Sequence, residues 1–310
     1  MPAQACATHR RARWSTPPSR PPAGPHAQPY RRRRPETTTL HRIVREHLET
    51  YLALANEAQP FGDGVPDHVE KELRSYLRCG ILAHGFARAR CASCGYDFLV
   101  AFSCKGRGCC PSCGAKRMAQ TAAHLVDHVI PHVPVRQFVL SVPKRLRPFL
   151  HYRPRTASAV LHILLRALRS SLREASPTAP RTAAMGAVSF LHRFGSSLNP
   201  HFHYHLCVVD GLFEKVEADT DPGSAHPESR LRFHEATALT HELLQLLQHT
   251  IRSRVLRHFR RHSLLEAHEA EDMLSWDHGG GFSLDGSVRI EATDRNGLER
   301  LIRYCARPPF

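Results

Sequence analysis

Three histidines at every second position, within residues 199–211, constrain the fold of this chain more than any other feature. His201, His203 and His205 alternate with apolar residues, and a further apolar run leads to an Asp-Gly pair typical of a strand end. Alternate side chains of a β-strand share one face, so His203 and His205 are expected to converge. Because neutral imidazole is a common metal ligand, the pair predicts a divalent metal site, with His201 as a candidate third ligand. A histidine-rich surface strand without metal is the alternative.

Cysteines form the second dense cluster. Six of the ten lie between Cys91 and Cys113, which favours metal-bound thiolates in a reducing compartment over a disulfide framework. Cys91-x-x-Cys94 is followed, after fifteen residues, by Cys110-x-x-Cys113, and four thiolates at this spacing predict a structural zinc ion. Buried free thiols are the alternative. Four further residues are left for a second zinc site or for simple packing: Cys79, His84, Cys104 and Cys109.

The charge of the chain indicates a polyanionic partner. The formal net charge is +15, and Lys and Arg that neutralise phosphates supply sequence-independent affinity for nucleic acid. Residues 1–35 contain eight arginines and no acidic residue, and we expect residues 1–36 to form a disordered basic tail. No segment has the apolar length of a membrane span or the apolar core of a signal peptide, which predicts a cytoplasmic protein without a membrane partner.

The hydrophobic pattern predicts an α+β fold. Strands and helices follow one another without the regular alternation of parallel α/β proteins, so a mainly antiparallel sheet is expected. A first domain is expected over 37–130 and a second over 131–310, with a polar loop over 215–232. Helices are expected over 38–56, 66–78, 115–130, 156–174, 234–262, 264–275 and 295–306, and strands over 135–142, 186–194, 201–214, 282–284 and 288–291.

A tyrosine lies on the last expected helix, at the edge of its apolar stripe. Leu298, Leu301, Ile302 and Cys305 form this stripe, and Tyr304 is placed where its hydroxyl can reach an active site. Taken alone, the position favours an ordinary boundary tyrosine with a packed ring and a hydrated hydroxyl.

Several blocks together resemble a known family. They are the cysteine blocks 91–94 and 103–113, the histidine block 194–211, the triple glycine at 279–281, and residues 304–309, with the sequence Tyr-Cys-Ala-Arg-Pro-Pro. In this order they resemble the insertion-sequence-ninety-one family of rolling-circle transposases, a branch of the HUH (His-hydrophobic-His) superfamily with an N-terminal zinc-binding domain. The resemblance covers roughly residues 40–310.

The resemblance implies a mechanism. It implies an HUH-nuclease-like sheet flanked by helices, with Mg²⁺ or Mn²⁺ on His203 and His205 and Tyr304 as the nucleophile. Tyr304 would attack single-stranded DNA at element ends and form a 5′-phosphotyrosyl link. Many relatives carry a second tyrosine one turn earlier, where this chain has Arg300, which favours a single-tyrosine mechanism.

Three other interpretations stay open at this stage. One is a non-catalytic zinc-ribbon protein that binds DNA, and another is a zinc hydrolase that uses His201, His203 and His205. The third is a truncated, inactive transposase, because the sequence ends at Phe310, shortly after the tyrosine motif.

Overall fold

The computed structural model describes residues 33–57, 65–92, 95, 97–106, 108–195, 199–216, 230–237 and 239–307. The chain divides between Gly114 and Ala115 into two compact units. This division falls before the boundary expected after residue 130. Most of the tail expected over 1–36 lies outside the described residues, and its last two residues belong to a 3₁₀ turn, Pro35–Thr37.

The first unit contains two helices and a hairpin. They are α1 (Thr39–Glu57), α2 (Asp67–Arg78), β1 (Phe86–Arg90) and β2 (Asp97–Ala101), with a 3₁₀ turn at Leu82–His84. Its small core joins Tyr76 to Cys79, Cys110 and Cys113, with Leu40 and Val44 packed against them. Sulfur atoms thus occupy the place where a larger domain would have an aliphatic core.

The second unit begins within α3 (Pro111–His124), which continues into a π-helical turn at Leu125–Val129. Its strands are β3 (Val135–Ser141), β4 (Ala187–Phe194), β5 (Pro200–Val209), β6 (Gly211–Val216), β7 (Arg230–Glu235), β8 (Ser283–Asp285) and β9 (Arg289–Ile290). Its other helices are α4 (Arg147–Tyr152), α5 (Pro154–Glu174), α6 (His241–Arg261), α7 (Ala267–Ser275) and α8 (Arg295–Cys305), with 3₁₀ turns at Lys144–Leu146 and His278–Gly281.

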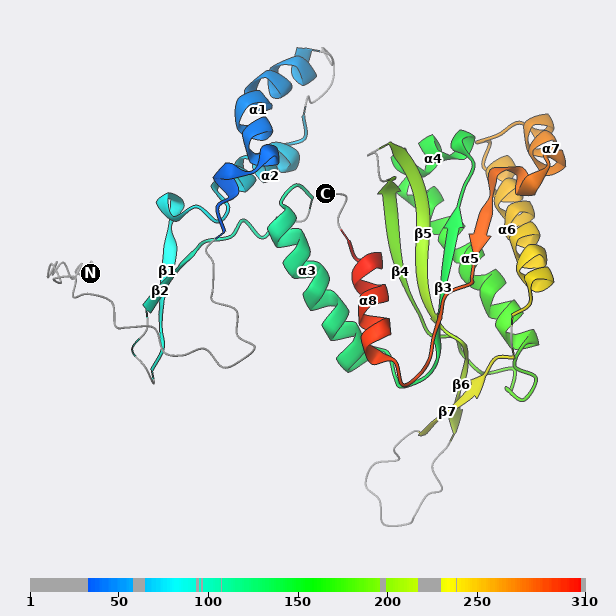
Figure 1. Cartoon of the computed structure of the whole chain (residues 1–310). Helices are drawn as coiled ribbons and strands as arrows, with labels where there is room; N and C mark the ends of the chain where they lie inside the picture. Colours follow the sequence, from blue (N-terminus) through cyan, green and yellow to red (C-terminus); the bar gives the residue numbers. More distant parts are fainter. Residues whose placement is uncertain are drawn as a thin grey trace, which may run out of the picture. The chain divides into compact units, whose positions relative to one another are not determined.

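Five strands form the main sheet of this unit, and every pairing within it is antiparallel. The order is β4-β5-β3-β8, and β9 also pairs with β3 (Figure 1). Strands β6 and β7 form a separate antiparallel hairpin. The expected α+β class with an antiparallel sheet is confirmed.

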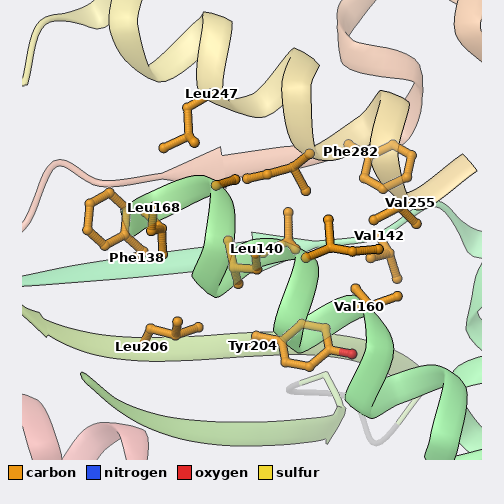
Figure 2. Packing of buried hydrophobic residues seen from close by; sticks show 14 of the residues in the cluster. Phe138, Leu140, Val142, Val160, Leu168, Tyr204, Leu206, Leu247, Val255 and Phe282 are labelled. Atoms are coloured by element: carbon orange, nitrogen blue, oxygen red, sulfur yellow. The ribbon is translucent and has the colours of Figure 1, made fainter. Parts of the chain in front are cut away.

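One face of the sheet packs on α5 and α6 and forms the main hydrophobic core (Figure 2). From β5 this face receives Phe202, Tyr204, Leu206 and Val208, the apolar partners in the alternation. The Tyr204 hydroxyl is buried and donates a hydrogen bond to the Ala157 carbonyl of α5, 2.8 Å away. This bond satisfies the one polar atom that β5 sends into the core.

The opposite face packs on α8 and on the segment that follows α3. Its smaller core includes Cys207 from β5, Val135 from β3, and Leu298 and Ile302 from α8. The Arg295 guanidinium fixes the start of α8, because it donates to the carbonyls of Ile130 and Pro131 at 2.8 and 3.0 Å. The histidine-bearing face of β5 is therefore the face that α8 covers.

A buried ion pair holds the end of β5. The Asp210 carboxylate accepts two hydrogen bonds from Arg136 of β3, at 3.0 and 2.8 Å, and one from Arg289 of β9, at 2.7 Å. The expected single strand over 201–214 is interrupted at this aspartate and becomes β5 and β6. Similarly, the expected helix over 234–262 begins later, after Thr240 caps α6, because residues 230–235 pair with β6.

Part of the loop expected over 215–232 is likewise β-structure, in β6 and β7. No helix in the described parts of the chain is both long enough and apolar enough to cross a membrane.

Candidate metal centres and catalytic site

Three histidines come together on the α8 side of the sheet. His203 and His205 lie on β5, and His192 lies on the neighbouring strand β4, directly opposite His203 in the strand register. Each offers a ring nitrogen, and these atoms lie within 4.8 Å of one another. Three imidazoles at this spacing suit one divalent cation and leave coordination positions for other ligands.

Hydrogen bonds to two of these rings fix which nitrogen can bind a cation. His203 Nδ1 lies 2.8 Å from the His201 carbonyl oxygen, and His192 Nε2 lies 2.6 Å from the Cys305 carbonyl oxygen. A carbonyl only accepts, so the ring nitrogen beside it must carry the proton. In the neutral rings, His203 Nε2 and His192 Nδ1 therefore keep free lone pairs, as metal-binding histidines require.

The third ring is held by an amide. His205 is 3% exposed, and its Nδ1 lies 3.0 Å from Nε2 of Gln137 on β3. The same amide nitrogen donates to Cys305 Sγ at 3.3 Å. Gln137 thus ties the central histidine to the helix that carries the candidate nucleophile.

Burial keeps the rings of His203 and His205 neutral. It lowers the pKa of His205 to about 3, and the neighbouring charges of His192 and His203 act in the same direction. Burial is also the main cause that lowers the pKa of His203. Neutral imidazole is the form that binds metals, so the environment favours the ligand state at physiological pH.

Tyr304 lies beside this histidine group. Its ring centroid is 5.6 Å from that of His205, in an edge-to-face arrangement, and the side chain is 51% exposed. The Arg307 guanidinium lies over the tyrosine ring, 5.5 Å from its centroid. The Tyr304 ring, the Arg307 guanidinium and the three imidazoles therefore lie close together beside α8.

The sequence candidate for a third ligand, His201, lies outside the group of converging nitrogens. The His201 ring packs against that of His203, with the ring centroids 4.7 Å apart. The third converging nitrogen comes from His192 and not from His201. Sequence reasoning missed His192. The alternation of Val188, Phe190 and His192 was an available signal, because Val188 and Phe190 pack on the same side of the sheet.

Four cysteines form a second group in the first unit: Cys79, Cys104, Cys110 and Cys113. The Sγ–Sγ distances are 3.7 Å for Cys79–Cys113, 3.6 Å for Cys104–Cys113 and 3.6 Å for Cys79–Cys110. Four thiolates at a Zn–S distance of ~2.3 Å in a tetrahedron stand about 3.8 Å apart, so the observed spacing fits one zinc ion.

This group differs in two members from the set expected by spacing. Cys110 and Cys113, at the start of α3, are joined by Cys79, which follows α2, and by Cys104, which follows β2. Cys91 lies outside the group, in the β1–β2 connection, and Cys94 lies outside the described residues. Backbone N–H groups of Cys104 and Gly106 donate to Cys79 Sγ and Cys104 Sγ at 3.3 Å, which suits thiolate sulfur.

The cysteine group and the histidine group lie in two segments of the chain that match two different protein families. Residues 43–142 match the transposase zinc-binding domain, and residues 186–310 match a family described as putative transposase. The chain is also 29% identical, over 150 residues, to the transposase for insertion sequence element IS801 of Pseudomonas savastanoi pv. phaseolicola. That alignment covers 48% of this chain and 35% of the relative, so the chain spans about a third of the relative's length.

No solved structure matches the chain. The sequence matches place it in the insertion-sequence-ninety-one family of transposases, with an N-terminal zinc-binding domain.

Proposed function

We propose that this protein is a DNA transposase that nicks and rejoins single-stranded DNA through a 5′-phosphotyrosyl intermediate. The observation that carries the proposal is the placement of Tyr304 beside the group formed by His192, His203 and His205. The two histidines on a central strand and the tyrosine on an adjacent helix also support an HUH-nuclease-like architecture for the second unit.

The histidine group would hold Mg²⁺ or Mn²⁺, with His192 in the position for which His201 was the sequence candidate. A bound divalent cation supplies Lewis-acid polarisation of the scissile phosphate and neutralises charge in the transition state. The protein orients the three rings through Gln137 and the carbonyls of His201 and Cys305. The two carbonyls also set the tautomers of His203 and His192 before a ligand arrives, whereas Gln137 contributes ring orientation.

Tyr304 supplies the nucleophile. Its phenolic oxygen forms a bond to phosphorus as it loses its proton, and the bond from phosphorus to the 3′ oxygen breaks. The departing 3′ oxygen takes up a proton and becomes a free 3′-OH, while the 5′ phosphate stays on the tyrosine. A later 3′-OH attacks this link and rejoins the strand. With Arg300 one helical turn earlier, a single tyrosine carries out both steps.

The first unit would bind structural zinc through Cys79, Cys104, Cys110 and Cys113. Its helices and hairpin are small, and the ligands come from separate segments of it. Metal binding therefore contributes directly to the folding of this unit, as in other small zinc domains. A role of Cys91 and Cys94 in zinc binding stays a prediction.

The test is covalent capture of DNA. The full chain is incubated with single-stranded oligonucleotides and Mg²⁺ or Mn²⁺, and adducts are separated on a denaturing gel. We expect a metal-dependent adduct with the native chain and none with Tyr304→Phe. Tyr152→Phe is the matched control, because Tyr152 is 85% exposed on α4 and does not belong to the histidine group.

Two results would contradict this function. DNA binding without any adduct would support a non-catalytic zinc-ribbon protein or an inactive transposase. DNA hydrolysis that persists in Tyr304→Phe would support a zinc hydrolase.

A further inference from the structure

Two helices on the sheet face opposite the histidine group carry arginines with almost no acidic residues. Helix α5 has no Asp or Glu between Pro154 and Arg173, and α6 has none between Leu243 and Arg261. Both helices bury their apolar stripes in the main core, and most of their arginines are exposed, whereas Arg252 of α6 is buried and donates to the Met273 carbonyl. This concentration of positive charge is separate from the site described above.

The arginines converge on a cavity between the two helices. Arg166 of α5 and Arg254, Arg257 and Arg261 of α6 line a cavity of about 380 Å³, together with His258 and His262. The three α6 arginines are spaced by three and four residues, which places them in one row on the helix. His258 and His262 also line a neighbouring cavity of about 710 Å³, to which Arg153 and Arg155 contribute.

These arginines lack acidic partners. Within the described residues, none of Arg166, Arg254, Arg257 and Arg261 forms an ion pair, and all four are exposed. Arg145 and Arg232, elsewhere on the same unit, each have a glutamate partner. Unpaired cations side by side repel one another, and a bound polyanion relieves that repulsion.

We propose that this arginine groove, defined by Arg166, Arg254, Arg257 and Arg261, binds the phosphate backbone of a second stretch of DNA. The proposal rests on the proposed function and extends it. Because β5 directs its histidines to one face and packs its other face on α5 and α6, the groove and the histidine group lie on opposite sides of the sheet. The DNA in the groove is thus a different stretch from the one held at Tyr304.

Arginine suits this role better than lysine alone would. Its planar guanidinium presents several donors in a fixed fork that matches phosphate oxygens. Backbone contacts of this kind position a strand and carry no sequence preference, so the groove would hold DNA independently of the recognised element ends.

The test compares two triple variants of the full chain. Arg254→Gln, Arg257→Gln and Arg261→Gln remove three groove charges. The control combines Arg145→Gln, Lys215→Gln and Arg232→Gln, which removes three charges from the same unit outside the groove. Binding of a long single-stranded oligonucleotide is measured by fluorescence anisotropy over a range of salt concentrations.

We expect the groove variant to bind more weakly and to show a log–log salt slope that is shallower by about 2, at ~0.7 for each phosphate that it no longer neutralises. The control should keep the native slope, and a third variant with the same groove arginines changed to Lys should keep most of it. If the salt slope becomes shallower by the same amount in the groove variant and in the control, the effect comes from net charge and the proposal is overturned. An unchanged slope in the groove variant would also overturn it.

Covalent capture separates this proposal from the proposed function. At saturating concentrations of a short oligonucleotide, the groove variant should still form the Tyr304 adduct, which also shows that it is folded. If the native chain forms no adduct, the proposed chemistry fails while the salt-slope comparison still decides the groove. If the adduct forms and the groove variant binds like the native chain, the groove proposal alone fails.

Discussion

His192 Nε2 donates to the Cys305 carbonyl, 2.6 Å away, and this bond joins strand β4 to the last turn of the helix that carries Tyr304. The same histidine offers its other nitrogen to the group with His203 and His205. One ring thus contacts both the candidate metal position and the helix that carries Tyr304. The position of Tyr304 relative to a bound cation depends on this link.

Replacement of His192 by Ala should weaken Mn²⁺ binding more than replacement of His201. His192 supplies one of the three converging nitrogens, whereas His201 contributes its backbone carbonyl, which Ala retains. We expect His192→Ala to cost at least the roughly 10–100-fold in affinity that removal of an outer hydrogen-bond partner costs. Titration calorimetry with Mn²⁺ measures both variants, and a larger effect of His201→Ala would reassign the third ligand.

Gln137 is expected to act by positioning His205. Gln137→Leu removes the side-chain contact with His205 Nδ1 and should weaken Mn²⁺ binding by roughly 10–100-fold. Gln137→Glu replaces the donating amide nitrogen with an oxygen that accepts from Nδ1–H, which leaves Nε2 free for a cation, so this variant should retain more of the affinity. If both variants bind Mn²⁺ like the native chain, the contact has no positioning role. Far-ultraviolet circular dichroism checks that each variant keeps its fold.

The cysteine group predicts which thiols hold zinc. Cys104→Ser should lower the zinc content of the purified protein and make the first unit sensitive to proteolysis, since a tetrahedral site lacks one of its four ligands. Cys109→Ser is the matched control, because Cys109 neighbours Cys110 but lies outside the group. Zinc is quantified by elemental analysis. A fall in zinc content for Cys91→Ser, with Cys104→Ser unaffected, would favour the set expected from spacing.

The buried aspartate at the end of β5 should matter for stability. Asp210→Ala leaves the guanidinium groups of Arg136 and Arg289 without their shared carboxylate, and breaking a buried pair typically costs about 3–5 kcal/mol. Glu291→Gln removes an exposed partner of Arg289 and should cost less than about 1 kcal/mol. Urea unfolding followed by circular dichroism compares the two, and similar midpoints would contradict the assignment.

The sequence of a single segment was enough to predict those strands and helices that depend only on the periodicity of that segment. The alternation around His203 and His205 predicts a strand with two different faces, and the apolar spacing over 156–174 predicts α5; the structure has both elements. Tyr304 was placed on its helix by the same argument. These assignments depend only on the periodicity of one segment.

The site residues that residue spacing did not predict join their groups through contacts between segments far apart in the sequence. His192 joins the group because of the register between β4 and β5, which no pattern within either strand determines. Cys79 and Cys104 join Cys110 and Cys113 because α2 and the β1–β2 hairpin bring their ends to the start of α3. Two Cys-x-x-Cys pairs are compatible with either arrangement, so spacing alone could not choose between them.

The two chemically different faces of β5 also restrict how its sequence can change in length. One inserted or deleted residue between His203 and His205 would turn one imidazole toward Tyr204 and Leu206 and move an apolar side chain to the Tyr304 side. The core would then contain an imidazole without partners, and the cation position would lose a donor. Point substitutions on either face can be tolerated separately, but a single-codon insertion or deletion here damages stability and chemistry together, and only a change of two residues restores the alternation.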